Sequence, residues 1–225
     1  LGQNPASARA LLAMHSQLTF SVIPRLPYSL QTAEAANRAG VEVMLHLPMQ
    51  PLEDGRHDVS SDEIREGMSG AQVSRAISRD LASVPYAAGV NNHMGSRATS
   101  DAALMSSVMM ALGREHLYFV DSRTTPDSVA LGVARRMGVP AFYRSVFLDD
   151  VRTVPYTLGQ LRKLCAIAER EGAALAIGHP YPTTIAALRQ FLPEFTWQGI
   201  ELTPASHLVR MPGIARLAPP HSHSM

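Results

Sequence analysis

The chain has 225 residues, of which 46% are hydrophobic and 17% charged, a composition that supplies a core and excludes a disordered chain. Its 20 Lys and Arg balance 19 Asp and Glu, so the net charge of +1 gives no basic excess that would indicate nucleic-acid binding. A single cysteine excludes an intramolecular disulfide and a multi-cysteine zinc site.

Membrane and targeting signals are absent from the sequence pattern. No apolar run reaches the length of about 18 residues that a membrane-spanning helix needs. The first five residues, LGQNP, have neither an initiator Met nor the basic and apolar segments of a signal peptide. We therefore expect the chain to be a processed or trimmed part of a longer protein.

The predicted elements alternate between short apolar strands and longer amphipathic helices. The pattern predicts helices over residues 4–17, 32–38, 60–84 (broken at 67–70), 101–114, 128–137, 158–171 and 184–192. Between them it predicts strands over residues 18–23, 41–45, 87–90, 118–120, 173–177 and 199–202, with one or two extended pieces over 141–148.

Local signals at the helix ends support this assignment. Asn4 followed by Pro5 is typical of a helix start, and Ser60 with Glu63 has the spacing of a capping box. Ser100 and Asp127 are the expected caps of the next two helices. Alternating strands and helices indicate parallel strands with helical crossovers, and so an α/β layer or barrel. We predict one domain over residues 1–212 and a flexible tail over 213–225.

Polar side chains that could bind a metal ion or transfer a proton lie at the ends of successive predicted strands. They are His46, Asn91, Asn92, His93, Asp121, Arg123, Asp149, Asp150 and His179. Because the carboxyl ends of parallel strands meet at one rim, we expect these side chains to lie close together. Histidine and carboxylate ligands suit zinc or a similar divalent ion, and the same groups supply an acid/base pair.

Each histidine also has a structural interpretation. A histidine at the end of a strand is often a hydrogen-bonded structural residue, but three in succession favour a metal shared by His46 and His93. His179 lies between Gly178 and Pro180 after an apolar strand, where it either takes part in chemistry or packs against polar backbone.

The other polar residues leave two interpretations open as well. Asp121 acts in catalysis, caps a loop through Ser122 or pairs with Arg123. Asn91 and Asn92 either shape a turn, because asparagine tolerates left-handed φ angles, or hold the substrate or the side chains that surround the site. Asp149 either has a functional role, such as contacting substrate, or belongs to a plain turn. No glycine-rich phosphate loop and no G-x-S-x-G motif is present.

Five sequence blocks together resemble the divergent polysaccharide deacetylase family. They are MLHLPMQP (44–51), NNHMGSRAT (91–99), FVDSRTTPDSVA (119–130), RSVFLDD (144–150) and AIGHPYPTTIAAL (176–188). The resemblance implies a distorted (β/α) barrel with one divalent metal ion, usually zinc. It further implies that metal-bound water hydrolyses N-acetyl groups of an envelope polysaccharide, in a periplasmic or secreted protein.

The resemblance also implies roles for particular residues. His46 corresponds to a metal-binding histidine, but the position four residues later, where the relatives have a second histidine, is Gln50. His93 is then the second metal-binding histidine, and His179 corresponds to the general acid.

Further roles follow for the remaining rim residues. Asp121 and Arg123 correspond to a region that orients the acid/base groups. From their places at strand ends rather than from the resemblance, Asn91, Asn92 and Asp149 are the expected substrate-binding residues.

One departure from the family pattern concerns the start of the chain. The relatives open with a strand that ends in an acidic pair, and Leu1-Gly2 resembles the residues just after that pair. We therefore expect the first strand and both carboxylates to lie outside this sequence. The carboxylates are missing, and the MLHLP block has a single histidine. A second interpretation is therefore an inactive envelope protein that binds glycan or a protein partner. A metal-dependent hydrolase of another amide or ester is a third interpretation.

Overall fold

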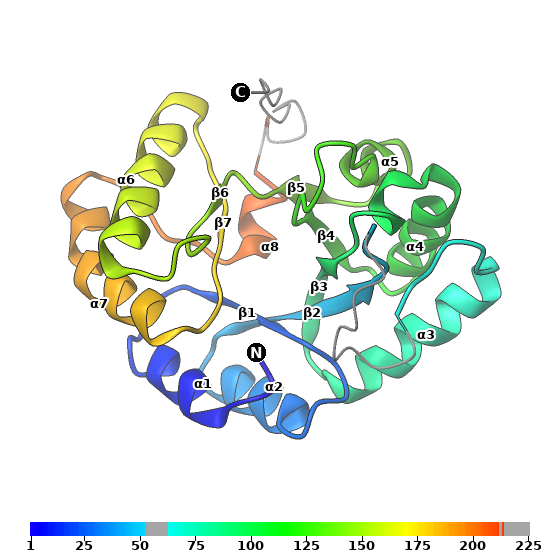
Figure 1. Ribbon diagram of the computed structural model, residues 1–225, viewed down its shortest axis with the longest axis horizontal. Coiled ribbons are helices and arrows are strands. Elements are labelled where there is room, and N and C mark those ends of the chain that lie inside the picture. The colour runs from blue at the N-terminus through cyan, green and yellow to red at the C-terminus, as the bar shows by residue number, and fades with distance from the viewer. Residues whose placement is uncertain (53–62, 212, 214–225) are drawn as a thin grey trace.

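A parallel sheet of five strands forms the centre of the molecule in the computed structural model, which describes residues 1–52, 63–211 and 213 (Figure 1). In spatial order, its strands are β1 (Thr19–Val22), β2 (Glu42–Met49), β3 (Ala87–Met94), β4 (Tyr118–Asp121) and β5 (Ala141–Tyr143). Every neighbouring pair is parallel, so the predicted α/β class is confirmed.

Two further strands, β6 (Val146–Phe147) and β7 (Ala176–Ile177), form a separate parallel pair. The described strands do not close into one hydrogen-bonded barrel, because β1 and β5 are the edges of the larger sheet. Figure 1 shows β6 and β7 beside that sheet, on the side of the two long C-terminal helices. The predicted distorted barrel is thus observed as two parallel sheets with surrounding helices.

Helices link the strands in sequence. They are α1 (Pro5–Leu12), α2 (Ser29–Arg38), α3 (Gly70–Ser83), α4 (Ala102–Arg114), α5 (Ala130–Arg136), α6 (Val154–Glu171), α7 (Pro182–Trp197) and α8 (Ala205–Leu208), with a 3₁₀ turn, η1, at Ala98–Ser100. The expected start at Asn4 is confirmed, because its side chain accepts a hydrogen bond from the backbone of Ala6 at 2.8 Å. No helix of the described residues is long and apolar enough to cross a membrane.

Several predicted boundaries are wrong. The helix expected over 60–84 begins only at Gly70, capped by Ser69, while Ile64 bridges to Met49. Positions 60–62 of the expected capping box, and positions 212 and 214–225 at the predicted tail, lie outside the described residues. Asp101 rather than Ser100 caps α4, and α5 has no side-chain cap although Asp127 was expected.

The strand predicted over 199–202 is absent, and the chain there leads into α8 instead. Gly199 has a φ of 68°, and Ile200 donates its backbone N–H to the carbonyl of Phe195, which ends α7. The apolar side chains of Ile200 and Leu202 pack against the second core instead of joining a sheet. Apolar residues with no strand partner in reach therefore gave a false strand signal.

Two apolar clusters hold the described structure together. The larger one packs the five-stranded sheet, including Leu45 and Phe119, against the helices that cover it. The smaller one joins β6 and β7 to α6 and α7 through Leu161, Phe191 and Phe195. Each sheet is therefore anchored to its own helices, and each carries its own part of the candidate site.

A close approach between β3 and β4 depends on a glycine. Gly89 pairs with Tyr118, and a Cβ atom at position 89 would lie 2.4 Å from the tyrosine ring. Tyr118 is 1% exposed, and its hydroxyl donates to Glu42 Oε1 at 2.8 Å. The backbone N–H of Ser206 in α8 donates to the same carboxylate oxygen at 3.1 Å. The small residue therefore makes room for a ring that links the sheet to α8.

We predict that Gly89→Ala lowers the free energy of unfolding by about 1–3 kcal/mol, because the ring of Tyr118 must move. Gly159→Ala is the matched control, since position 159 is exposed in α6 with open space around a Cβ atom. It should raise the free energy of unfolding by about 1 kcal/mol through helix propensity. Denaturant unfolding measures both, and equal values for the two variants would contradict the packing argument.

Candidate functional site

Two histidines from neighbouring strands meet on one face of the sheet. In the register of β2 and β3, His46 pairs with Asn91 and Pro48 pairs with His93, and alternate residues of a strand share a face. His46 Nε2 and His93 Nδ1 are 3.0 Å apart, and the ring centroids are separated by 4.7 Å. The expectation that these histidines come together is confirmed, while their role as metal ligands stays a prediction.

The polar surroundings of His46 come from three strands. Its Nδ1 lies 3.0 Å from Asn91 Oδ1, which also accepts a hydrogen bond from the hydroxyl of Ser21 in β1. Asn91 Nδ2 donates to Ser122 Oγ at 3.2 Å, directly after β4. Desolvation by the surrounding protein, and then the charge of His93, lower the pKa of His46 well below its ordinary value. His46 is therefore kept neutral, the form in which an imidazole offers a lone pair to a metal.

A second pair, Asp149 and His179, follows the two strands of the smaller sheet. His179 Nδ1 lies 3.0 Å from Asp149 Oδ1, and the backbone N–H of His179 donates to Asp149 Oδ2 at 2.6 Å. Thr184 Oγ1, in the first turn of α7, donates to the same Oδ2 at 2.8 Å. The side chain of Asp149 is 0% exposed and that of His179 is 45% exposed. The carboxylate thus lies beneath the imidazole and fixes its orientation.

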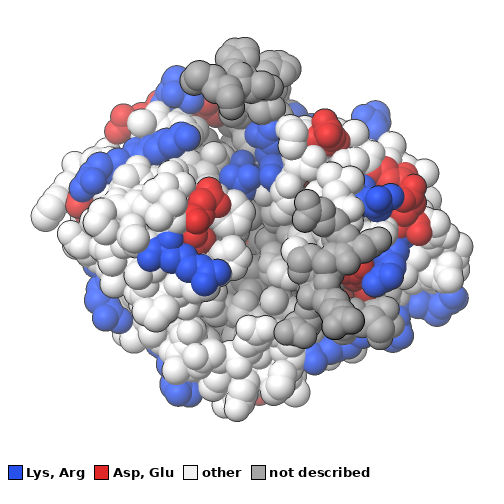
Figure 2. Space-filling view, viewed as in Figure 1, with Lys and Arg blue, Asp and Glu red and all other residues white. Residues whose placement is uncertain are grey.

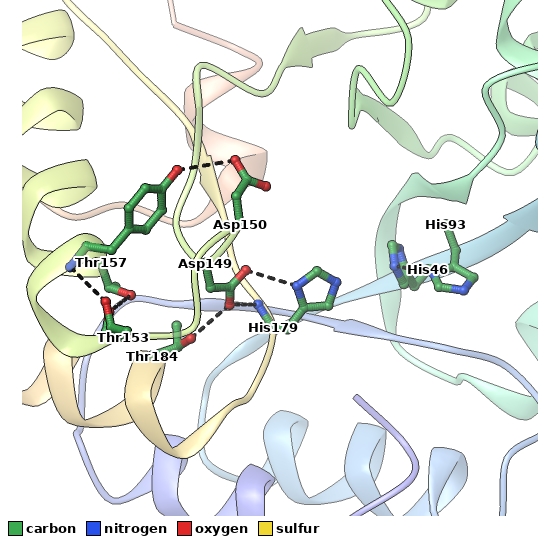
Figure 3. Close-up of polar contacts among 9 residues, drawn as sticks. His46, His93, Asp149, Asp150, Thr153, Thr157, His179 and Thr184 are labelled. Carbon is green, nitrogen blue, oxygen red and sulfur yellow. Dashed lines mark hydrogen bonds and ion pairs between the residues drawn. The ribbon is translucent and has the colours of Figure 1, made fainter.

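The rings of the two pairs face a common space. Figure 3 shows the imidazole of His179 directed toward His46 and His93 from the opposite sheet. Figure 2 shows that this face of the molecule is hollowed beside the α6–α7 side, where both basic and acidic side chains stand at the border. A separate cavity of about 520 Å³, lined by residues 14–17 and the end of α7, contains none of these three histidines. The three-histidine arrangement is therefore the candidate site.

Asp149 occupies a different position from the one expected of a substrate-binding residue. Its carboxylate is fully buried and engaged by His179 and Thr184, so a substrate in the hollow would meet the imidazole first. The predicted direct contact with substrate is corrected accordingly. The prediction of a plain turn is also wrong, because the hydrogen bonds join residues 30 and 35 positions apart.

Asp121 and Arg123 are not brought to the histidines. Asn91 pairs with Val120, so the next residue, Asp121, points to the opposite face of the sheet. Asp121 accepts hydrogen bonds from the Arg123 backbone N–H and from Ser128 Oγ, both at 2.8 Å. Burial raises the pKa of Asp121. These are the contacts of a loop cap, and the catalytic role predicted for Asp121 and Arg123 has no contact with the site to support it.

Asn92 likewise points away from the histidines. Its Oδ1 accepts from the backbone N–H of Ser122 at 2.8 Å, and its Nδ2 donates to the carbonyl of Met94 at 2.7 Å. These bonds shape the ends of β3 and β4. Of the two asparagines predicted to bind substrate, Asn91 alone contacts His46, and substrate binding stays a prediction for both.

Aromatic and basic side chains around His179 were missed by sequence reasoning. The rings of Phe147 and Tyr181 lie 5.6 Å and 5.3 Å from the imidazole centroid. Arg144 lies over Phe147 at 4.7 Å, and Arg152 lies over Tyr181 at 4.1 Å. Tyr181 stands in the same HPYP run as His179, which was a usable signal. The position of Thr184 had none, because it depends on how α7 packs.

The two imidazoles are the metal donors that the described part of the chain brings together here. Among residues 1–52, 63–211 and 213, no group of three or more His, Cys, Asp or Glu is arranged to hold a metal ion. The spacing of 3.0 Å between His46 Nε2 and His93 Nδ1 suits two ligands of one ion, since zinc–nitrogen bonds are about 2.0–2.1 Å long. The two imidazoles therefore fit a divalent ion in donor type and spacing, and they would be two of its ligands.

Known proteins resemble this chain along nearly its whole length. The profile of the family described as "Divergent polysaccharide deacetylase" matches residues 1–209. YibQ of Escherichia coli is 37% identical over 97% of this chain and 68% of its own length. A Haemophilus influenzae protein is 38% identical over 80% of this chain and 64% of its own length. A crystal structure of a protein from Agrobacterium tumefaciens has a TM-score of 0.87 at 24% identity, covering 92% of this chain and 85% of that one, which supports the fold.

We predict that Thr184→Val lowers the free energy of unfolding by about 1–3 kcal/mol, because a buried carboxylate oxygen loses a hydrogen-bond donor without a change in side-chain shape. Thr32→Val is the matched control, since its hydroxyl is equally buried in α2 and has no hydrogen-bond partner among the described residues. The control should leave the protein as stable or more stable. Denaturant unfolding compares them, and equal losses would show that the Thr184 bond contributes nothing.

Proposed function

This chain belongs to the divergent polysaccharide deacetylase family, and from that premise we propose that it removes N-acetyl groups from a polymeric amino sugar of the cell envelope. One observation carries the proposal: His46 and His93 lie 3.0 Å apart and face His179, which a buried carboxylate orients. Two potential metal ligands opposite a potential proton donor are what amide hydrolysis needs. An envelope substrate places the activity outside the cytoplasm, in the periplasm or the medium.

The proposed cofactor is a divalent metal ion, with zinc as the ion we infer. His46 Nε2 and His93 Nδ1 would hold it, since neutral imidazole nitrogens are ligands that zinc prefers. When bound, such an ion supplies Lewis-acid chemistry, which polarises the acetyl carbonyl and lowers the pKa of water. Because the described residues offer no third His, Cys, Asp or Glu at this place, other groups or water complete the ligand set.

His179 would serve as the general acid. Its Nδ1 is directed at Asp149 Oδ1, so the ring presents Nε2 to the hollow. From there it can give a proton to the nitrogen atom that leaves when the amide bond breaks. Asp149 would act through His179 as a positioning residue, because its carboxylate accepts from the ring and favours one ring orientation. Phe147 and Tyr181 restrict the ring further.

A second function has one observation in its favour. The described residues place no carboxylate with the two imidazoles, and a site without an anionic ligand holds zinc less firmly. An inactive envelope protein that binds glycan or a protein partner in the same hollow would have such a site. Glycan binding without release of acetate would select this function over hydrolysis.

We predict that the protein binds one Zn²⁺ ion and that His46→Ala and His93→Ala each abolish stable zinc binding. His207→Ala is the matched control, because His207 is exposed in α8 and has no part in the site. The measurement is elemental analysis after dialysis, with calorimetric titration for affinity. Unchanged zinc content in both site variants would refute the assignment of these ligands.

We predict that His179→Ala keeps its zinc but loses about 100- to 10 000-fold of the rate of acetate release, the usual contribution of a general acid. The assay follows acetate from chitin-type oligomers and from peptidoglycan, with and without added Zn²⁺. Loss of zinc from the His179 variant would contradict this division of roles. If the unsubstituted protein binds these glycans but releases no acetate, the proposed deacetylase activity is wrong.

A further inference from the structure

Asn91 and Asn92 are neighbours in sequence with opposite orientations. Both are buried, at 2% and 1% exposed, and they point to opposite faces of β3. Asn91 contacts the ring of His46, whereas Asn92 contacts only backbone groups among the hydrogen bonds of the described residues. The two side chains therefore form a natural matched pair for separating local structure from an effect on the site.

The hydrogen-bond partners of Ser122 determine which way the Asn91 amide faces. Ser122 Oγ lies 2.8 Å from the backbone carbonyl of Asn92, a group that only accepts, so the hydroxyl proton is directed there. The same Oγ can then only accept from Asn91, which requires the NH₂ group of Asn91 at that place, 3.2 Å away. The carbonyl oxygen Oδ1 of Asn91 must consequently face Ser21 and His46.

The orientation of Asn91 in turn determines the proton position on His46. Oδ1 has no proton to give, so His46 Nδ1, 3.0 Å away, must be the donor. A neutral imidazole carries one ring proton, and its other nitrogen, Nε2, then bears the lone pair. That nitrogen is the one 3.0 Å from His93 Nδ1, where the metal ion is expected.

We propose that Asn91 is a positioning residue that fixes His46 in the Nδ1–H tautomer, with the Nε2 lone pair directed at the metal position. The inference rests on the proposed function for its metal, and it adds a role that Asn91 performs through His46. Partners that fix the tautomer and orientation of a ligand histidine typically contribute 10- to 100-fold to metal affinity. The series of hydrogen bonds from the Asn92 carbonyl through Ser122 and Asn91 to His46 starts at a backbone group of the sheet. The fixed position of that carbonyl therefore determines which atom donates at each step.

The tautomer is measured on the metal-free protein, independently of zinc and of activity. A long-range ¹H–¹⁵N correlation spectrum, recorded well above the ordinary histidine pKa of about 6.5, distinguishes a protonated ring nitrogen from an unprotonated one. We expect His46 in the unsubstituted protein to carry its proton on Nδ1. In Asn91→Leu, which removes the acceptor, the proton should redistribute to Nε2. An Nε2–H tautomer in the unsubstituted protein would overturn the inference.

The affinity for Zn²⁺ is measured on the same variants by competition with a chelating dye. Asn91→Leu should bind zinc 10- to 100-fold more weakly. Asn91→Asp keeps an acceptor facing His46 and should restore the affinity of the unsubstituted protein or exceed it. Ser122→Ala, which releases the amide of Asn91, should weaken binding in the same direction and remains informative if Asn91→Leu fails to fold.

Asn92→Leu is the control for a purely structural effect. It should lower the unfolding temperature, because Ser122 and Met94 lose their partners, but leave the tautomer of His46 unchanged. Zinc binding by Asn91→Leu that equals that of the unsubstituted protein would overturn the positioning role while the proposed function stands. Failure of the unsubstituted protein to bind zinc would overturn the proposed function, and the tautomer would still decide the hydrogen-bond assignment.

Discussion

The parallel register between β2 and β3 is the constraint on which the candidate site depends. It sets His46 opposite Asn91 and brings His93, two residues further along, to the same face of the sheet. A shift of one residue would turn His93 to the helix side and bring Asn92 into its place. The register is held by a long ladder and by buried apolar side chains such as Leu45 and Leu47, which fill the opposite face. The proximity of the two histidines thus depends on the packing of apolar side chains on the opposite face of the sheet.

The second half of the site depends on a different core. Asp149 and His179 follow β6 and β7, which α6 and α7 anchor through their own apolar cluster. Three hydrogen bonds to the Asp149 carboxylate, two of them from His179, fix the imidazole against two aromatic rings. The hollow between the sheets is therefore bounded by two separately packed parts, one with potential metal ligands and the other with a potential proton donor. This division matches the two roles that amide hydrolysis requires.

The sequence blocks that resemble the family contain every residue of this arrangement except Ser21 and Arg152. Within the blocks, however, residue type alone did not distinguish the roles. Asn91 and Asn92 have the same chemistry, yet one meets His46 and the other shapes a strand end. Asp121 ends β4 and Asp149 follows β6, and both are buried carboxylates, yet Asp149 contacts a site histidine and Asp121 does not among the contacts of the described residues. The sequence therefore predicts the family and the positions of the histidines, but not which of the neighbouring residues contact them.

The sequence by itself determined the alternation of strands and helices, the helix start at Asn4 and the placing of polar residues at strand ends. These features depend on neighbouring residues, whose periodicity and capping chemistry can be read directly. Only the tertiary structure decided which residues share a face, which carboxylate lies under His179, and that residues 199–202 lead into α8 rather than forming a strand. The shared faces and the pairing of His179 depend on contacts between residues 30 to 45 positions apart, such as His179 with Asp149 and His46 with Asn91. Strand register and helix packing create these contacts, and no local pattern encodes them.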